Sequence, residues 1–191
     1  MRQGEKMGAR HPDKREQRIN WQTDYERVRS ALRAGAANGC YVFDALMTDD
    51  AGLLDYLVVG PDGITAIVVR SERGDLTADP DTGELLTIRS PFADDPRRQA
   101  NDQIEDVARH LDRPDVAMFV LICFPRADFR YSGNPKADRG VYQTWGLPKI
   151  FEEQEEVLQP EEVDELARAI ESIYSRPPFV RPGEPYGGQT I

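Results

Sequence analysis

The stretch of sequence that decides the fold is residues 53–74, LLDYLVVGPDGITAIVVRSERG. Two apolar runs rich in Val and Ile, residues 53–59 and 64–69, flank the four residues GPDG at 60–63. Runs of this length bounded by Gly and Pro are typical of strands that are buried on both faces. Glycine permits a positive φ and proline holds φ near about −65°, so the GPDG sequence predicts a tight turn. The stretch therefore predicts a β-hairpin at the centre of the fold.

Two charged residues break the apolar pattern of this hairpin. Asp55 interrupts the first run, and Arg70 ends the second. A charge is costly to bury in a central hairpin unless it has a partner or a functional role. We therefore treat these two positions as the first candidates for a functional site.

The rest of the chain predicts helices and strands around the hairpin. Thr23 and Glu26 have the spacing of a capping box, so a helix is expected to begin at Thr23 and to end between residues 35 and 39. Pro96 suits the first turn of a second helix, which runs to residue 111, and Pro160 suits the first turn of a last helix. Further strands are expected at residues 41–47, 75–78, 84–89 and 116–124. This order predicts an α/β fold with a central mixed β-sheet flanked by helices.

The composition predicts one folded domain, residues 23–174, between two tails. Residues 1–22 are expected to form a mobile basic tail, and residues 175–191 an extended tail rich in Pro and Gly. The first 22 residues hold six basic and three acidic side chains, a net charge of +3, so the rest of the chain carries −13. Because an acidic body repels nucleic acid, any phosphate contact must lie in a local basic patch.

The residue types argue against several classes of protein. No apolar run approaches the roughly 18 residues of a membrane span, and the N-terminus lacks an apolar signal core, which predicts a cytoplasmic protein without membrane contact. Cys40 and Cys123 do not form a CxxC pair and are expected to be buried, reduced thiols. Because His11 and His110 are the only histidines, a histidine-based zinc site and a Ser-His-Asp triad are not expected.

Residues 125–148 show no regular pattern and carry a local positive charge. Four basic residues stand against two acids, a net +2 in an otherwise acidic body. Long irregular loops are often functional, and aromatic residues among arginines suit base stacking and phosphate contact. This segment is therefore a candidate for contact with nucleic acid or another partner, the alternative being an insertion whose aromatic residues pack on the core. The candidate contact residues are Arg126, Arg130, Lys136, Arg139 and Trp145.

Several of these features occur in a fixed order. Asp55 is followed by GPDG at 60–63, then by Gly74, and then by a Pro-x-x-Gln sequence that ends at Gln99 and opens a helix. In this order and spacing the chain resembles the nuclease-related domain (NERD) family, over residues 23–124 with a weaker continuation to residue 173. The resemblance implies the restriction-endonuclease-like fold of the PD-(D/E)XK nucleases, whose central mixed β-sheet is flanked by helices.

The resemblance also implies roles for particular residues. Members of the family are expected to use an Asp on one strand of the hairpin and a Glu-x-Lys on the next, supported by a Glu and a Gln on helices. Asp55 then matches the metal ligand, Gln99 the supporting glutamine and Glu26 the helix carboxylate. In such a site, carboxylate oxygens bind Mg²⁺, which activates a water molecule that the lysine positions.

The Glu-x-Lys positions depart from the family pattern, because they hold Val68-Val69-Arg70. Valine offers no oxygen to a metal, and arginine stays protonated and cannot act as a base. The simplest inference is a degenerate site, in which Asp55 and Arg70 form a buried, hydrogen-bonded ion pair in place of the metal.

Three functions remain open at this stage. The first, and the principal hypothesis, is a catalytically impaired, nuclease-like binding or scaffold protein for nucleic acid or a protein partner, with no cofactor. The second is an Mg²⁺-dependent DNA or RNA nuclease in which Glu72 or Asp102 supplies the lost carboxylate beside Asp55. The third is a nucleic-acid binder that keeps phosphate contacts through Arg70 and the loop arginines, with an affinity that falls steeply with salt.

Overall fold

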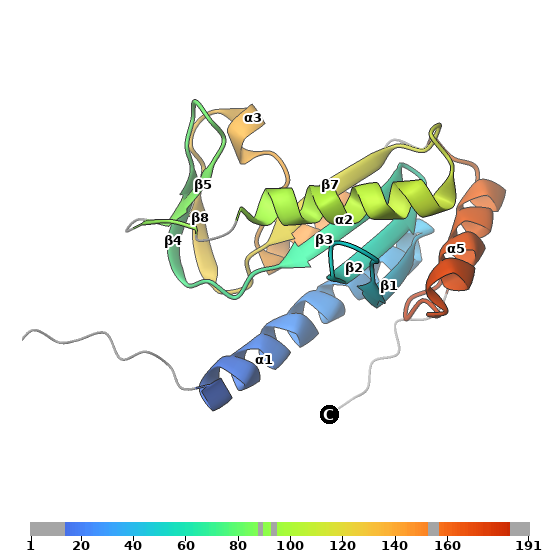
Figure 1. Cartoon of the computed structure of the whole chain (residues 1–191), viewed down its shortest axis with the longest axis horizontal. Coiled ribbons are helices and arrows are strands. Elements are labelled where there is room, and N and C mark those ends of the chain that lie inside the picture. The colour runs from blue at the N-terminus through green and yellow to red at the C-terminus, as the bar shows by residue number, and fades with distance from the viewer. Residues whose placement is uncertain (1–13, 88–89, 93–94, 153–156, 184–191) are drawn as a thin grey trace, which may run out of the picture.

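The computed structural model describes residues 14–87, 90–92, 95–152 and 157–183, and it has a five-stranded sheet at its centre (Figure 1). The strand order is β1-β2-β3-β7-β9, with antiparallel pairing from β1 to β3 and parallel pairing from β3 to β9. Helices flank this mixed sheet, so the predicted α/β architecture is confirmed at that level. The strands are β1 (Tyr41–Met47), β2 (Leu53–Gly60), β3 (Gly63–Val69), β7 (Met118–Cys123) and β9 (Val141–Tyr142).

The predicted central hairpin is confirmed as β2 and β3. Every residue of β3 is buried, as expected for a strand covered on both faces. The turn depends on Gly63, whose φ is 127° and where an added Cβ would lie 2.2 Å from the backbone oxygen of Ala117. Only glycine tolerates both this backbone conformation and this close approach.

The two faces of the sheet are covered by different helices. Helices α2 (Pro96–Leu111) and α5 (Pro160–Tyr174) pack on one face, where Val107 and Leu166 join the core. Helices α1 (Lys14–Leu32) and α4 (Leu147–Glu152) pack on the other, where Val28 and Phe151 are buried. The starts predicted at Pro96 and Pro160 are confirmed, and Asp95 caps α2 by accepting a hydrogen bond from the backbone N–H of Arg97.

The first helix begins nine residues earlier than predicted, at Lys14 instead of Thr23. Residues 14–22 contain neither Gly nor Pro, so nothing in their backbone stops the helix from extending toward the N-terminus. The proposed capping box at Thr23 is therefore wrong, and residues 14–22, predicted to be part of a mobile tail, are helical. Residues 1–13 lie outside the described part of the chain. After α1 the chain continues as a 3₁₀ helix, η1 (Arg33–Asn38).

A second, smaller sheet lies beside the first, and its strand order is β6-β5-β4-β8 (Figure 1). Its first hairpin was predicted, whereas β8, which pairs in parallel with β4, lies in the segment expected to be irregular. The strands are β4 (Gly74–Ala78), β5 (Leu85–Thr87), β6 (Ser90–Pro91) and β8 (Ala127–Arg130). A third apolar cluster, which contains Leu76, Phe124 and Phe129, joins this sheet to β7.

The expectation that residues 125–148 form one irregular loop is wrong. After β8 the chain forms α3 (Pro135–Asp138), β9, the 3₁₀ helix η2 (Thr144–Gly146) and α4. These elements are two to six residues long, too short for a periodic pattern, and they are held by partners that are distant in the sequence.

The C-terminal segment returns to the main sheet. Val180 is buried and pairs with Val42 of β1, and Phe179 packs against the core under α1. Residues 184–191 of the predicted extended tail lie outside the described residues. Among the described helices, none combines the length and the apolar character that a membrane crossing requires.

Candidate functional site

The hairpin, the residues that follow it and α2 bring four of the predicted site residues together around one pocket of about 480 Å³. The strand register pairs Tyr56 with Ile67, so Asp55 and Val68 are the next pair along the two strands. Gln99 reaches the pocket from the first turn of α2. The residues that line this pocket, called the Asp55 pocket below, are Leu53, Asp55, Val68, Val69, Arg70, Ser71, Glu72 and Gln99.

Asp55 is held by the neighbouring strand and by α1. Its Oδ2 accepts a hydrogen bond from the backbone N–H of Val69 at 2.8 Å. The hydroxyl of Tyr25 donates to the backbone oxygen of Asp55 at 3.2 Å, and Tyr56 in turn donates to the backbone oxygen of Tyr25 at 2.7 Å. Burial raises the pKa of Asp55 to about 6, although the Val69 hydrogen bond and the charge of Arg70 oppose the rise. Asp55 is therefore a carboxyl group whose charged form is incompletely stabilised by the fold.

Arg70 is paired with Glu72, and the predicted ion pair between Asp55 and Arg70 is not formed. Glu72 Oε1 accepts from Arg70 Nη2 at 2.6 Å and from Arg70 Nε at 3.0 Å. The guanidinium also lies 5.8 Å from the ring centre of Phe92. The pairing is local, because both residues follow the end of β3 and their side chains reach each other two positions apart.

Two other predicted carboxylates do not join the Asp55 pocket. Glu26 is exposed on α1, and this helix covers the face of the sheet opposite to α2 and Gln99. Asp102 is exposed on α2 and is not among the residues that line the pocket. The structure therefore brings together Asp55, Arg70, Glu72 and Gln99 and leaves the other two candidates outside.

The residues of the Asp55 pocket do not fit a magnesium centre. Mg²⁺ prefers about six oxygen ligands in near-octahedral geometry, commonly including one or two carboxylates. The side chain of Val68 supplies no ligand atom, and Oε1 of Glu72 is engaged by Arg70. The guanidinium also places a permanent positive charge beside the remaining oxygens. Oε2 of Glu72 and Oγ of Ser71 are both buried without a hydrogen-bond partner within the described residues, so unsatisfied polar atoms remain in the pocket beside Asp55.

The five predicted contact residues of the 125–148 segment are divided among different roles. Arg126 is largely buried and its Nε donates to the buried carboxylate of Asp24, on α1. Arg130 pairs with Asp75 of β4 at 2.5 Å. The side chain of Trp145 is exposed, and its Nε1 donates to Gln143 at 3.2 Å. These side chains therefore do not form one basic surface with the Asp55 pocket.

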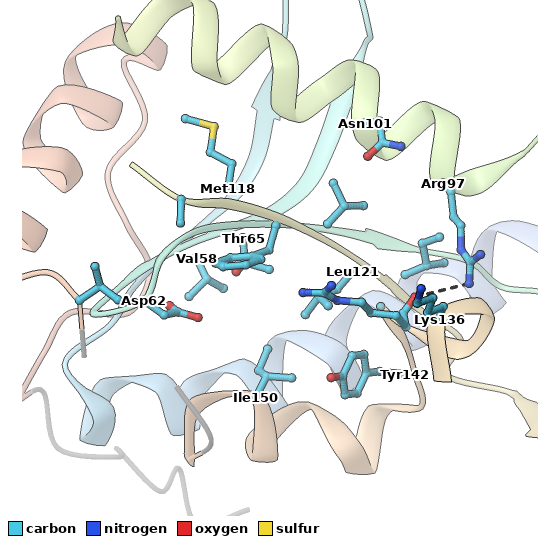
Figure 2. Close-up of a pocket in the computed structure, with 17 residues that line it drawn as sticks. Val58, Asp62, Thr65, Arg97, Asn101, Met118, Leu121, Lys136, Tyr142 and Ile150 are labelled. Atoms are coloured by element: carbon cyan, nitrogen blue, oxygen red, sulfur yellow. Dashed lines mark hydrogen bonds between the residues drawn. The ribbon is translucent and has the colours of Figure 1, made fainter. Parts of the chain in front are cut away.

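Lys136 and Arg139 instead line a larger cavity of about 1020 Å³ beside β7 (Figure 2). Arg97 and Asn101 enter it from α2, and Tyr142 of β9 lies on its opposite side. The guanidinium of Arg97 donates to the backbone oxygens of Gly83 and Ala137, which fixes its position at this end of the cavity. We call this cavity the β7 groove.

Buried ion pairs are the features that sequence reasoning missed. Besides the Asp24–Arg126 pair, Asp44 of β1 is buried and pairs with Arg176 at 2.8 Å and with Arg29 at 3.4 Å. A signal for Asp24 was present, because it precedes Val28 and Leu32 at intervals of four residues and so lies on the apolar stripe of α1. No comparable signal identifies its partner, which is 102 residues away.

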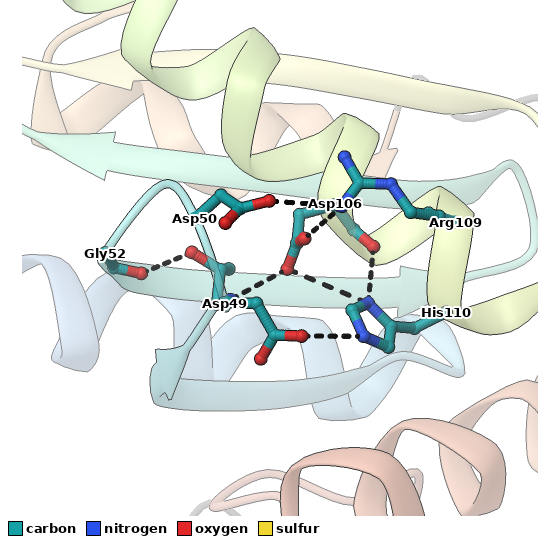
Figure 3. A network of polar contacts seen from close by, with 7 residues as sticks. Asp49, Asp50, Gly52, Asp106, Arg109 and His110 are labelled. Carbon is teal, nitrogen blue, oxygen red and sulfur yellow. Dashed lines mark hydrogen bonds and ion pairs between the residues drawn. The ribbon is translucent and has the colours of Figure 1, made fainter.

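A third group of polar residues, Asp49, Asp106 and His110, fastens the turn between β1 and β2 to α2 (Figure 3). Asp106 is buried and accepts from the backbone N–H of Asp49 and from Nη1 of Arg109, both at 3.1 Å. His110 contacts the backbone oxygen of Asp106 at 2.9 Å and the carboxylate of Asp49 at 3.1 Å. The hydrogen bond to Asp106, followed by the nearby negative charges, raises the pKa of His110. These contacts satisfy the group internally, so its role is structural.

The two cysteines are buried, as predicted, and neither forms a disulfide within the described residues. Burial raises the pKa of each thiol to about 12, so both stay protonated and unreactive at neutral pH. Neither lines the Asp55 pocket.

Comparisons of this chain with models of protein families, with curated proteins and with solved structures find no match. Function must therefore be argued from the geometry of the chain itself.

Proposed function

We propose that this chain is a nuclease-like domain of the NERD and PD-(D/E)XK type in which the cleavage site is impaired, and that it acts as a binding or scaffold protein. Its partner is a nucleic acid or another protein. Two features support the nuclease-like assignment: the central hairpin carries Asp55, and the helix that follows it places Gln99 in the same pocket. The catalytic Glu-x-Lys of such enzymes corresponds to Val68 and Arg70.

The single observation that carries the proposal is the Arg70–Glu72 ion pair. Arg70 places a positive charge where a dication would need negative ligands, and it engages Glu72, the one other carboxylate among the described residues that line the Asp55 pocket. Glu72 therefore serves as a partner of Arg70 and is not free to replace the lost catalytic glutamate. The second function, an Mg²⁺-dependent nuclease with a rearranged carboxylate set, requires this pair to open.

The pocket still has the properties of a binding site. Asp55 is a buried carboxyl group with a raised pKa, and Oε2 of Glu72 is buried without a hydrogen-bond partner in the described residues. Perturbed and unsatisfied groups of this kind concentrate at functional sites, because a ligand can supply the missing contacts. A ligand group that donates hydrogen bonds to these oxygens would complete the pocket without any bond cleavage.

Calorimetric titration with Mn²⁺ tests the loss of the metal site. We expect no saturable binding by the wild-type chain or by Asp55→Ala. The double variant Val68→Glu/Arg70→Lys restores the family pattern and is expected to gain Mn²⁺ binding. The matched control is Val157→Glu/Arg168→Lys, which makes the same two kinds of substitution at exposed positions. This control variant should gain no Mn²⁺ binding.

The proposal fails if the wild-type chain binds Mn²⁺ at one site and loses this binding in Asp55→Ala. Cleavage of DNA or RNA that disappears in the same variant would then establish the metal-dependent nuclease.

A further inference from the structure

The β7 groove contains an open edge of the main sheet. Backbone N–H groups of alternate residues in a strand point to alternate neighbours. The N–H of Ile122 donates to Gly140 at 2.7 Å and that of Phe124 to Tyr142 at 2.9 Å, so the even-numbered residues of β7 face β9. Met118 and Val120 face the same side, but β9 pairs only with Ile122 and Cys123. Beside Met118 and Val120, no strand of the described chain continues the sheet.

Within the described residues, the open stretch of β7 carries no charged residue and no proline of its own. Natural edge strands are commonly guarded by charged residues, proline, a bulge or a covering segment. Residues 118–121 are Met, Phe, Val and Leu, and all four are only partly buried. Along a strand, four residues span about 13 Å. The groove therefore offers unpaired backbone groups flanked by apolar side chains, over a length that suits a short extended segment.

The end of the groove is set by Gly140. Its φ is 76°, and an added Cβ would lie 2.8 Å from the backbone oxygen of Val120. The backbone at Gly140 therefore lies against the oxygen of Val120 and blocks strand pairing at that point. By the alternation along β7, the N–H of Val120 and the N–H and C=O of Met118 point to the groove.

The charges in the groove are divided between its two ends (Figure 2). Arg97 and Lys136 lie at the end near Leu121, and Arg139 also lines the cavity, whereas Asp62 lies at the opposite end. Lys136 and Arg139 are exposed and form no ion pair within the described residues. The groove therefore complements an extended ligand that is negative at one end only.

We propose that the β7 groove binds an extended segment of another protein, which adds a strand to the open edge of β7 and places an acidic residue beside Lys136 and Arg139. Backbone hydrogen bonds along a free strand edge are the means by which proteins capture peptides in extended conformation. A nucleic acid fits less well, because a polyanion along the groove would meet Asp62 and would leave the edge N–H and C=O groups without matching partners. This inference rests on the proposed binding function, because it assumes that the chain has a partner. The residues that it assigns to the partner are different from those of the Asp55 pocket.

Fluorescence anisotropy with labelled seven-residue peptides tests the proposal on the full chain. Each probe has alternating Val and Thr with two acidic residues at one end, placed at the N-terminus in one peptide and at the C-terminus in another. A third and fourth peptide carry lysines in place of the acids. We expect the wild-type chain to bind at least one acidic peptide and to bind its lysine counterpart at least tenfold more weakly.

Two variants separate the backbone contact from the charge contact. Val120→Pro removes an N–H that faces the groove and leaves the pairing with β3 intact, so acidic-peptide affinity should fall at least tenfold. Lys136→Glu should cause a similar loss and should improve binding of the lysine peptide. Arg168→Glu on α5 makes the same change in net charge outside the groove and should leave both affinities unchanged. The charge-swap result remains decisive if Val120→Pro does not fold.

The proposal is overturned if no peptide binds at 1 mM, or if affinity is unchanged in Lys136→Glu. It is also overturned if a labelled oligo-dT strand binds in the groove and competes with the peptide, or if light scattering detects a dimer that Val120→Pro dissociates. The β7 groove and the Asp55 pocket share no lining residue, so the peptide assay and the Mn²⁺ titration can fail separately.

Discussion

Asp55 and Asp106 are two carboxylates that differ in how many hydrogen-bond partners the fold gives them. Asp106 is the more deeply buried, with 1% of its surface exposed, and it accepts hydrogen bonds from Asp49 and Arg109. Within the described residues, the Asp55 carboxylate accepts one hydrogen bond, from Val69, and its pKa is raised. The supply of hydrogen-bond partners, more than the depth of burial, therefore distinguishes the carboxylate that holds a turn in place from the one whose pKa is raised.

The largest effect is expected from Asp106→Ala. The substitution removes the acceptor for the backbone N–H of Asp49 and for Nη1 of Arg109. The turn between β1 and β2 is then no longer held to α2 by these hydrogen bonds. We expect a loss of about 2–4 kcal/mol in the free energy of unfolding, measured by urea denaturation.

Asp50→Ala is the matched control for this prediction, because Asp50 also approaches Arg109 but is highly exposed. Its effect should stay within about 0.5 kcal/mol. Equal losses in the two variants would contradict the structural role assigned to Asp106.

Asp55→Asn is expected to change stability in the opposite direction. A carboxyl group whose pKa is raised by folding costs stability above its folded pKa, about 6 for Asp55, and this cost disappears as the pH falls toward its unfolded value, about 4. Asparagine can still accept the hydrogen bond from Val69 and carries no charge. The variant should therefore be more stable than the wild-type chain at pH 7.5 by about 1–3 kcal/mol.

The pH dependence checks the cause of this gain. Urea denaturation at several pH values should show the difference between the two proteins shrinking between about pH 6 and pH 4. A difference that is constant over this range would mean that the charge of Asp55 is not responsible.

The smallest effect is expected at Ala45, which lies on β1 between the residues paired with Tyr56 and Leu54 and so opposite Asp55. Its φ is 51°, a left-handed conformation that costs a non-glycine residue about 1–2 kcal/mol. Ala45→Gly should therefore raise the unfolding free energy by about 0.5–1 kcal/mol. Thermal denaturation measures the effect, and Ala31→Gly in α1, where glycine is unfavourable, should lower stability by a similar amount.

The parts of the fold that the sequence predicted are those determined by local signals. The hairpin follows from two apolar runs and a GPDG turn, and α2 follows from Pro96 and its apolar stripe. Asp55 and Gln99 were assigned to one site only by the resemblance to the NERD family, and the structure places both residues at one pocket.

The errors concern relations between distant segments. Glu26 was assigned to the site, but a helical pattern does not tell which face of the sheet a helix covers. Arg70 was paired with Asp55, although Glu72 is nearer along the chain and reaches it. The second sheet was missed in part, because β8 has four residues and depends on β4 for its pairing.

The Asp24–Arg126 contact also sets the time during synthesis at which α1 can complete its packing. Asp24 is near the beginning of the chain, and 102 further residues must be synthesised before its partner exists. At about 5–20 residues per second, this interval lasts about 5–20 s. Throughout that time Asp24 has only the longer contact with Arg27 of the same helix, at 3.9 Å. The buried ion pair that holds α1 against the sheet is therefore completed only after β7 has been made.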